Sequence, residues 1–200
     1  MSTQALHRHA PDPGKTRDAA GLELLRLARA SIEHGLVYGR PLPVDNDALP
    51  RALAAMAATF TTLRFQGQLR GCCGTLEPVR TLAEDVAYSA FRAAFRDVRF
   101  DPVGKHELAA IRLEVSVLSP LEPIRFSREA DLVGGLTPGI DGLVIIAEGR
   151  RATLLPKVWE MLPDPQQFLA ALKTKCGLSG TYWSERLEFQ RYRTTSYAEE

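Results

Sequence analysis

The sequence predicts an α+β fold. Segments with strand and helix patterns are mixed without a regular βαβ alternation, hairpins are frequent, and neither a Gly-x-Gly-x-x-Gly motif nor a Walker loop is present. The chain has 200 residues, which is enough to bury one sizeable core or two small subdomains that share a cleft.

The first half of the chain predicts a helix, a hairpin and a second helix. Helical periodicity runs from Asp18 to Gly35, which is placed to end the first helix. A loop and a short alanine-rich turn then lead to residues 59–65, a strand rich in β-branched and aromatic side chains. The second strand of the hairpin spans 69–76, because Pro78 cannot continue a ladder, and a helix runs from about Val79 to Phe95. The apolar positions of the first helix are Leu22, Leu25, Ala28 and Ile32.

The second half contains the clearest strand of the chain. Residues 111–118 alternate apolar and polar side chains, so one face of this strand packs on a core. The continuous apolar run at 143–147 predicts a strand covered on both faces. The further expected elements are a helix at 127–134, a strand at 151–155 that closes a hairpin, a short helix from Pro156 that places Trp159 in the core, a helix capped by Asp164 and ended by Gly177, and a last strand at 187–197.

The composition excludes several classes of protein. With 25 Lys+Arg against 24 Asp+Glu, the formal charge of +1 lacks the basic excess of a nucleic-acid-binding domain. The 3 cysteines form neither a disulfide framework nor a zinc pattern, which favours a reducing cytoplasm. No run approaches the length of a membrane span. Residues 1–17 are expected to be a disordered arm, in which His7 and His9 are incidental rather than a metal site.

The stretch from Leu69 to Pro78 is the first candidate site. In a strand, Arg70 and Cys72 share a face, and a permanently charged guanidinium beside a thiol favours the thiolate. Gly71 and Gly74 would let a backbone or a ligand approach closely. The alternative stays open at this point: glycine in a strand often marks only a bulge, and cysteine is often a core residue.

Two further segments carry candidate site residues. Arg96, Asp97 and Arg99 in the loop at 96–105 could clamp an anionic ligand in bidentate fashion, or Asp97 could pair internally with one arginine. Glu114 and Ser116 lie on the polar face of the strand at 111–118. If this strand neighbours the 69–76 strand, they meet Arg70 and Cys72, or Arg70 and Glu114 form a plain cross-strand pair.

Five ordered blocks of the sequence together resemble the AMMECR-one domain, which bacterial and archaeal genomes label AmmeMemoRadiSam system protein A. They span about residues 20–197, and the chain departs from the family pattern at Cys73, usually aliphatic, and at Val98, usually proline. The blocks are LRGCCG at 69–74, AFRDVRFDPV at 94–103, LEVSVLSP at 113–120, PGIDGL at 138–143 and RATLLPKVW at 151–159.

The resemblance implies a single domain at 18–197, made of two subdomains around a cleft, the larger on an antiparallel β-sheet flanked by helices. The first hypothesis is a cytoplasmic enzyme or enzyme component that binds a small anionic substrate near Cys72. Cys72 is then the nucleophile or redox thiol and Glu114 the candidate acid or base. The substrate-binding residues are Arg70, Gly71, Gly74, Arg96, Asp97, Arg99 and Ser116. Neither His34 nor His106 stands at a motif position, which argues against a Cys-His dyad, and no metal or cofactor is predicted.

A second hypothesis is a non-catalytic partner module. The family name records domains that occur beside, or fused to, Memo-like proteins resembling extradiol dioxygenases and radical S-adenosylmethionine enzymes, so the chemistry could reside in those partners. A role in RNA modification is a third reading. It is disfavoured, because the net charge is near zero and basic and aromatic residues are not interleaved.

Overall fold

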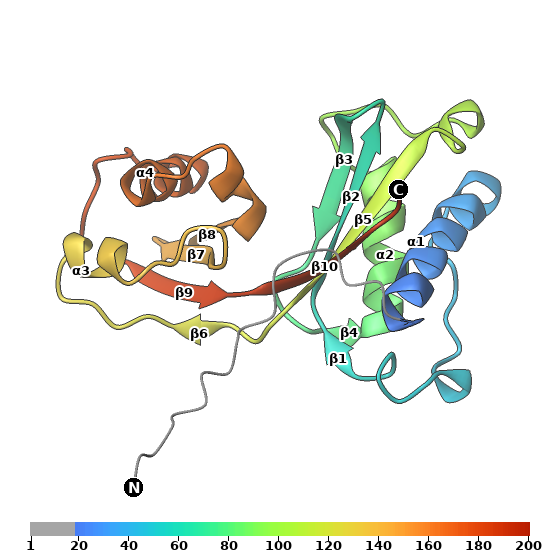
Figure 1. Cartoon of the computed structure of the whole chain (residues 1–200), viewed down its shortest axis with the longest axis horizontal. Coiled ribbons are helices and arrows are strands. Elements are labelled where there is room, and N and C mark those ends of the chain that lie inside the picture. The colour runs from blue at the N-terminus through green and yellow to red at the C-terminus, as the bar shows by residue number, and fades with distance from the viewer. Residues whose placement is uncertain (1–18) are drawn as a thin grey trace, which may run out of the picture.

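The computed structural model describes residues 19–200 and arranges them in two halves, each built on a four-stranded antiparallel sheet (Figure 1). The strand order is β10-β5-β2-β3 in the first sheet and β6-β9-β7-β8 in the second. This architecture confirms the α+β prediction. The expected arm at 1–17, with His7 and His9, lies outside the described residues.

The elements of the first half are α1 (Ala19–Tyr38), β1 (Met56–Ala57), β2 (Thr59–Phe65), β3 (Gln68–Gly74), β4 (Arg80–Thr81), α2 (Leu82–Phe95), β5 (Ile111–Leu118) and β10 (Thr194–Ala198). The elements of the second half are β6 (Glu122–Pro123), α3 (Glu129–Gly134), β7 (Gly142–Ala147), β8 (Arg150–Leu154), α4 (Pro165–Lys175) and β9 (Glu188–Tyr192). The 3₁₀ helices η1 (Asn46–Ala48), η2 (Lys105–Glu107) and η3 (Pro156–Glu160) lie between them.

In the first half, α1 and α2 cover one face of the sheet and leave the other face toward the second half (Figure 1). The odd-numbered residues of β5, Ile111, Leu113 and Val115, are buried in the core beneath these helices. Alternation along a strand therefore directs the even-numbered residues of β2 and β5 to the opposite face. That face holds the candidate site.

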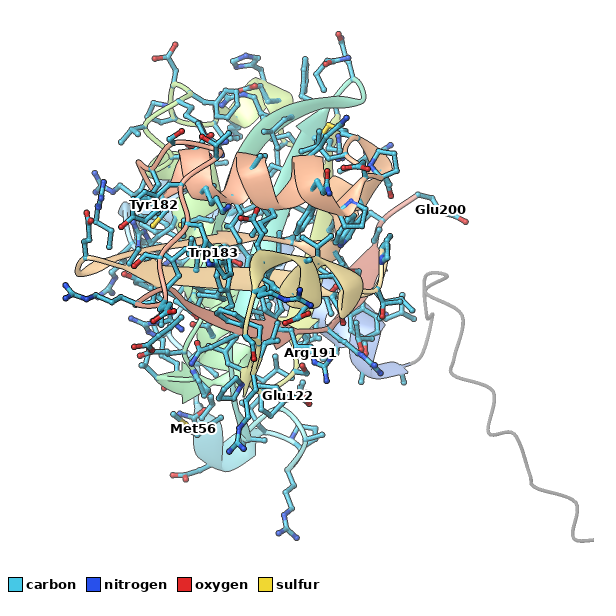
Figure 2. All side chains as sticks on the ribbon, turned by 90° about the vertical axis from the view of Figure 1, so that its left-hand side faces the viewer. Met56, Glu122, Tyr182, Trp183, Arg191 and Glu200 are labelled. Carbon is cyan, nitrogen blue, oxygen red and sulfur yellow. The ribbon has the colours of Figure 1, made fainter. Side chains whose placement is uncertain are left out.

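The second half has a separate core. The aromatic rings of Trp159 and Phe168 stack 3.8 Å apart, and both side chains are buried, as expected for Trp159. The strand β7 is buried on both faces over most of its length, which confirms the prediction for 143–147. Figure 2, in which this half faces the viewer, shows Glu122 and Arg191 together on the outer surface, where β6 pairs with β9.

The two halves meet at a small third cluster of buried side chains, Ala58, Leu118, Val144 and Tyr192. The predicted strand at 187–197 crosses this junction, and the prediction of one strand is wrong. β9 belongs to the second sheet and β10 to the first, with Arg193 between them. A pattern of alternation does not reveal the point at which a chain leaves one sheet for another.

The two long helices begin or end at other residues than expected. Gly35 does not end α1, which continues to Tyr38. A Cβ at position 35 would lie 2.5 Å from the Phe95 ring, so the glycine allows close helix packing. Leu22 is exposed, because the buried face of α1 runs through Leu24, Leu25 and Ala28. The helix α2 begins at Leu82, where Thr81 forms a capping box, and not at Val79.

Candidate functional site

Three side chains form one row across the open face of the first sheet. In the β-sheet register Thr62 of β2 pairs with Glu114 of β5 on one side and with Cys72 of β3 on the other. Directly paired residues point to the same face, so the thiol and the carboxylate flank the threonine hydroxyl. β2 therefore lies between β3 and β5, which the sequence left open as direct neighbours. β2 also supplies Thr62, which was not among the predicted site residues.

Cys72 is held by contacts to both its backbone and its sulfur. The Thr62 hydroxyl donates to Cys72 Sγ at 3.5 Å, and the Cys72 N–H donates to Asp97 Oδ2 at 2.9 Å. Cys73 points the other way, into the core of the first half, where burial raises the pKa of its thiol. It is half-buried. The adjacent cysteines thus occupy different environments, and only Cys72 faces the row.

Asp97 and Arg99 pair with each other beside Cys72. The Arg99 guanidinium donates to Asp97 Oδ1 at 2.9 Å and to Oδ2 at 2.6 Å. This bond, together with the Cys72 N–H bond, lowers the pKa of Asp97 to about 2. The internal pairing considered as the alternative is therefore the arrangement in the structure. Arg96 is exposed at the end of α2, and its side chain makes no hydrogen bond within the described residues.

The second half brings two lysines to the row. Lys157 Nζ of η3 donates to Glu114 Oε2 at 2.5 Å, and the Glu114 side chain is only 15% exposed. Lys175, in the last turn of α4, donates to the Thr153 carbonyl at 2.9 Å. Desolvation lowers the pKa of Lys175, attraction to Cys72 opposes this effect, and the Arg99 charge adds to it. Lys175 is thus close enough to Cys72 and Arg99 for their charges to act on its pKa.

Arg70 does not reach Cys72 or Glu114. The register shifts between Leu63 and Arg64, which pair with Gly71 and Leu69, so Arg70 is the additional residue of a β-bulge. Its guanidinium turns to Glu107, with Nε–Oε1 and Nη2–Oε2 distances of 2.8 and 3.0 Å. The same ion pair lowers the pKa of Glu107. The expectation that Arg70 is the cation beside the thiol is therefore wrong, and so is the alternative Arg70–Glu114 pair.

Gly71, Gly74 and Ser116, which were predicted to bind a substrate, contact other residues of the protein instead. A Cβ at Gly71 would lie 2.1 Å from the Ala93 carbonyl, and one at Gly74 would lie 2.4 Å from the Phe60 ring. The close approach expected at these glycines is thus made by the protein itself. Ser116 faces the same side as Glu114, but it is buried and shares a 2.8 Å hydrogen bond with Ser196.

Neither histidine of the described residues lies at the row. His34 Nδ1 contacts the Arg40 carbonyl at 2.9 Å, and His106 lies beside Gly104 and Glu107. No group of three or more His, Cys, Asp or Glu side chains that could hold a metal ion occurs between residues 19 and 200. Cys72 interacts instead with Lys175, Arg99 and Asp97.

The assembled row places a thiol beside a hydroxyl, a carboxylate and the ammonium groups of two lysines. Thr62 donates to the sulfur, Lys175 supplies a cation that no carboxylate neutralises within residues 19–200, and Glu114 supplies a carboxylate held by Lys157. Among the residues at the row, Lys157, Lys175 and Thr62 were not predicted from the sequence. One available signal was that lysine is rare in this chain: only Lys15, Lys105, Lys157, Lys173 and Lys175 are lysines among 25 basic residues.

Comparisons with known proteins show relatives over most of the chain. A family model described as AMMECR1 matches residues 25–197. A protein of Methanothermobacter thermautotrophicus is 38% identical over 159 residues, which cover 79% of this chain and 82% of that protein. Protein MJ0810 of Methanocaldococcus jannaschii is 33% identical over 183 residues, 90% of each chain.

A solved structure is also similar. The crystal structure of the uncharacterised protein PH0010 from Pyrococcus horikoshii matches with a TM-score of 0.85 and 32% identity, over 92% of this chain and 93% of that one. Within the part of the chain that the structure describes, no helix has the length and apolar character needed to cross a membrane.

Proposed function

The chain belongs to the AMMECR1 family, and from this premise we propose that the row Cys72–Thr62–Glu114 binds a small anionic molecule and that Cys72 is the thiol that reacts with it. We propose further that the protein is an enzyme or enzyme component and that it works in the cytoplasm. The free thiol state of Cys72, Cys73 and Cys176 supports a reducing compartment.

One observation carries the proposal: both halves of the chain contribute functional groups to the same row. The first half supplies the thiol, hydroxyl and carboxylate, and the second half supplies the ammonium groups of Lys157 and Lys175. A sheet face that only had to pack against a neighbouring half would be apolar, as it is at Phe60 and Leu118. The polar row begins where that apolar contact ends.

Each residue of the row has a chemical role in this proposal. Lys175 attracts the anion, and the Thr62 hydroxyl stabilises the negative sulfur by donating a hydrogen bond. Glu114 is held by Lys157 as a carboxylate that can accept a proton from the bound molecule. Asp97 positions Cys72 through the backbone N–H and orients Arg99.

Alkylation by iodoacetamide tests the site directly, since tandem mass spectrometry resolves the two adjacent cysteines. We expect Cys72 to react about tenfold faster than Cys73 at pH 7.5, because burial raises the pKa of the Cys73 thiol. Sulfate, phosphate or a dicarboxylate should slow the reaction of Cys72. Lys175→Met should reduce this protection, and Lys105→Met, at an exposed lysine of η2, should not.

Equal rates at Cys72 and Cys73, or no protection by any anion in the wild type, would contradict the proposal. That outcome would favour the partner-module alternative, in which the family resemblance points to a Memo-like dioxygenase homologue and a radical S-adenosylmethionine protein. Cys72→Ser should keep the melting temperature of the wild type, which separates loss of a reactive thiol from loss of the fold.

A further inference from the structure

Two arginines lie directly opposite each other on the same face as the row. Arg64 of β2 pairs in register with Arg112 of β5, two residues along the strands from Thr62 and Glu114. Two residues of a strand advance about 7 Å. The arginine pair therefore stands one step from the thiol row, toward the turn that joins β2 to β3, which extends away from the junction of the two halves (Figure 1).

Neither guanidinium has a carboxylate partner within residues 19–200. Arg64 Nη1 donates to the Gly67 carbonyl at 3.3 Å, and Arg112 Nη1 donates to the Ala109 and Ile111 carbonyls at 3.1 and 3.3 Å. Three other cations around the site are neutralised: Arg99 by Asp97, Arg70 by Glu107 and Lys157 by Glu114. Like charges directly opposite each other destabilise a sheet, and no carboxylate within residues 19–200 offsets the repulsion of this pair.

We propose that Arg64 and Arg112 form a second anion subsite, so that the site takes an elongated molecule with a carboxylate or phosphate at the end remote from Cys72. This inference rests on the proposed function, because it assumes that the other end of the molecule lies at the thiol row. Planar guanidinium groups suit bidentate binding of either anion.

The packing of the face sets the direction in which the molecule extends. Beyond Thr62 and Glu114 on one side, Phe60 and Leu118 are covered by the second half through Val144 and Tyr192. On the other side the Arg112 side chain is exposed and Arg64 is half-exposed. A molecule bound at Cys72 is therefore blocked on the Phe60 side and can extend along the strands toward the arginine pair, over about 7 Å.

The test compares short dicarboxylates with monocarboxylates of equal length, glutarate with pentanoate and succinate with butyrate. Binding is measured by protection of Cys72 from iodoacetamide. We expect the doubly anionic probes to protect at concentrations about tenfold lower than their singly anionic counterparts, the gain of one charge-assisted contact. Arg64→Gln and Arg112→Gln should remove that advantage, and Arg40→Gln, at an exposed arginine after α1, should keep it.

The results separate this inference from the proposed function. If phosphate protects Cys72 but the extended probes gain nothing from Arg64 and Arg112, the second subsite is wrong and the proposed function stands. If no probe protects Cys72, both are wrong. Arg112→Gln should also leave the melting temperature unchanged or raise it, because it relieves repulsion. A fall would show that the pair is structural and would overturn the inference.

Discussion

Asp97 links the site to the loop that follows α2. Its carboxylate accepts hydrogen bonds from the Cys72 N–H and from Arg99, and its side chain is only 6% exposed. Since the pKa of Asp97 falls to about 2 in the folded protein, the ionised carboxylate stabilises the fold above the ordinary pKa of 3.8. That contribution is lost as the pH falls from about 4 to about 2.

Asp97→Asn should therefore lower the free energy of unfolding by about 1 to 2 kcal/mol at pH 6. This range allows for solvent screening of the ion pair, because the Arg99 side chain is exposed. The difference from the wild type should be smaller at pH 3. Urea unfolding at the two pH values measures it. Asp101→Asn, at an exposed carboxylate of the same loop, is the control and should have little effect at either pH. A difference that does not change with pH would assign the loss to packing and not to the charge of Asp97.

At the scale of residues, the alternation of a strand directs Cys72 and Cys73 to opposite faces, and the structure agrees, because the register is regular at that point. The same rule failed two residues earlier. The bulge at Arg70 is not visible in the sequence, since it depends on how β3 pairs with β2, and it turns the guanidinium to Glu107. Lys157 and Lys175 could not be placed at all, because their proximity to the row depends on how the two halves meet.

At the scale of elements, β3 is an edge strand that is held in place by close contact with α2. Gly71 makes that contact possible, because a Cβ there would lie 2.1 Å from the Ala93 carbonyl. A helix backbone cannot move aside as a flexible side chain can. Gly71→Ala should therefore displace β3 and destabilise the protein by about 2 to 4 kcal/mol, as measured by urea unfolding.

Gly134→Ala provides the matched control, since a Cβ at that position meets nothing within 4 Å and its φ is not positive. It should change the stability by no more than about 0.5 kcal/mol. The displacement of β3 should also change the iodoacetamide reactivity of Cys72. A Gly71→Ala protein with wild-type stability would show that β3 and α2 are less tightly packed than the structure indicates.

The kinds of most elements could be predicted from the sequence, and several of their boundaries could not. Strong local signals, such as the alternation in β5, the apolar run of β7 and the Asp164 cap of α4, were sufficient. Gly35 carried the signal of a helix end, yet in the structure it serves the contact between α1 and α2. The residue that separates β9 from β10 is set by the tertiary arrangement of two sheets.

At the scale of the whole molecule, the two cores are joined through a small junction. Tyr192 is buried there, its ring lies against Gly142, and its hydroxyl shares a 2.7 Å hydrogen bond with Thr153. Burial raises the pKa of Tyr192, so the hydroxyl stays protonated. The same residue ends β9, directly before the chain crosses to β10. Tyr192 therefore joins the halves both through packing and along the chain.

This arrangement predicts that the halves unfold together in the wild type and separately in Tyr192→Ala. Both tryptophans, Trp159 and Trp183, belong to the second half, and Cys73 packs in the first, so fluorescence and Cys73 labelling in a Cys72→Ser background report the two halves. Their urea midpoints should coincide for the wild type. Tyr192→Ala should lower stability by about 3 to 5 kcal/mol and move the fluorescence midpoint below that of Cys73.

Leu172→Ala is the control, because it creates a cavity within the second core and leaves the junction intact. It should shift both midpoints equally. If Tyr192→Ala also shifts them equally, then other contacts between the halves, such as Lys157–Glu114 and Arg151–Glu77, are sufficient to couple them.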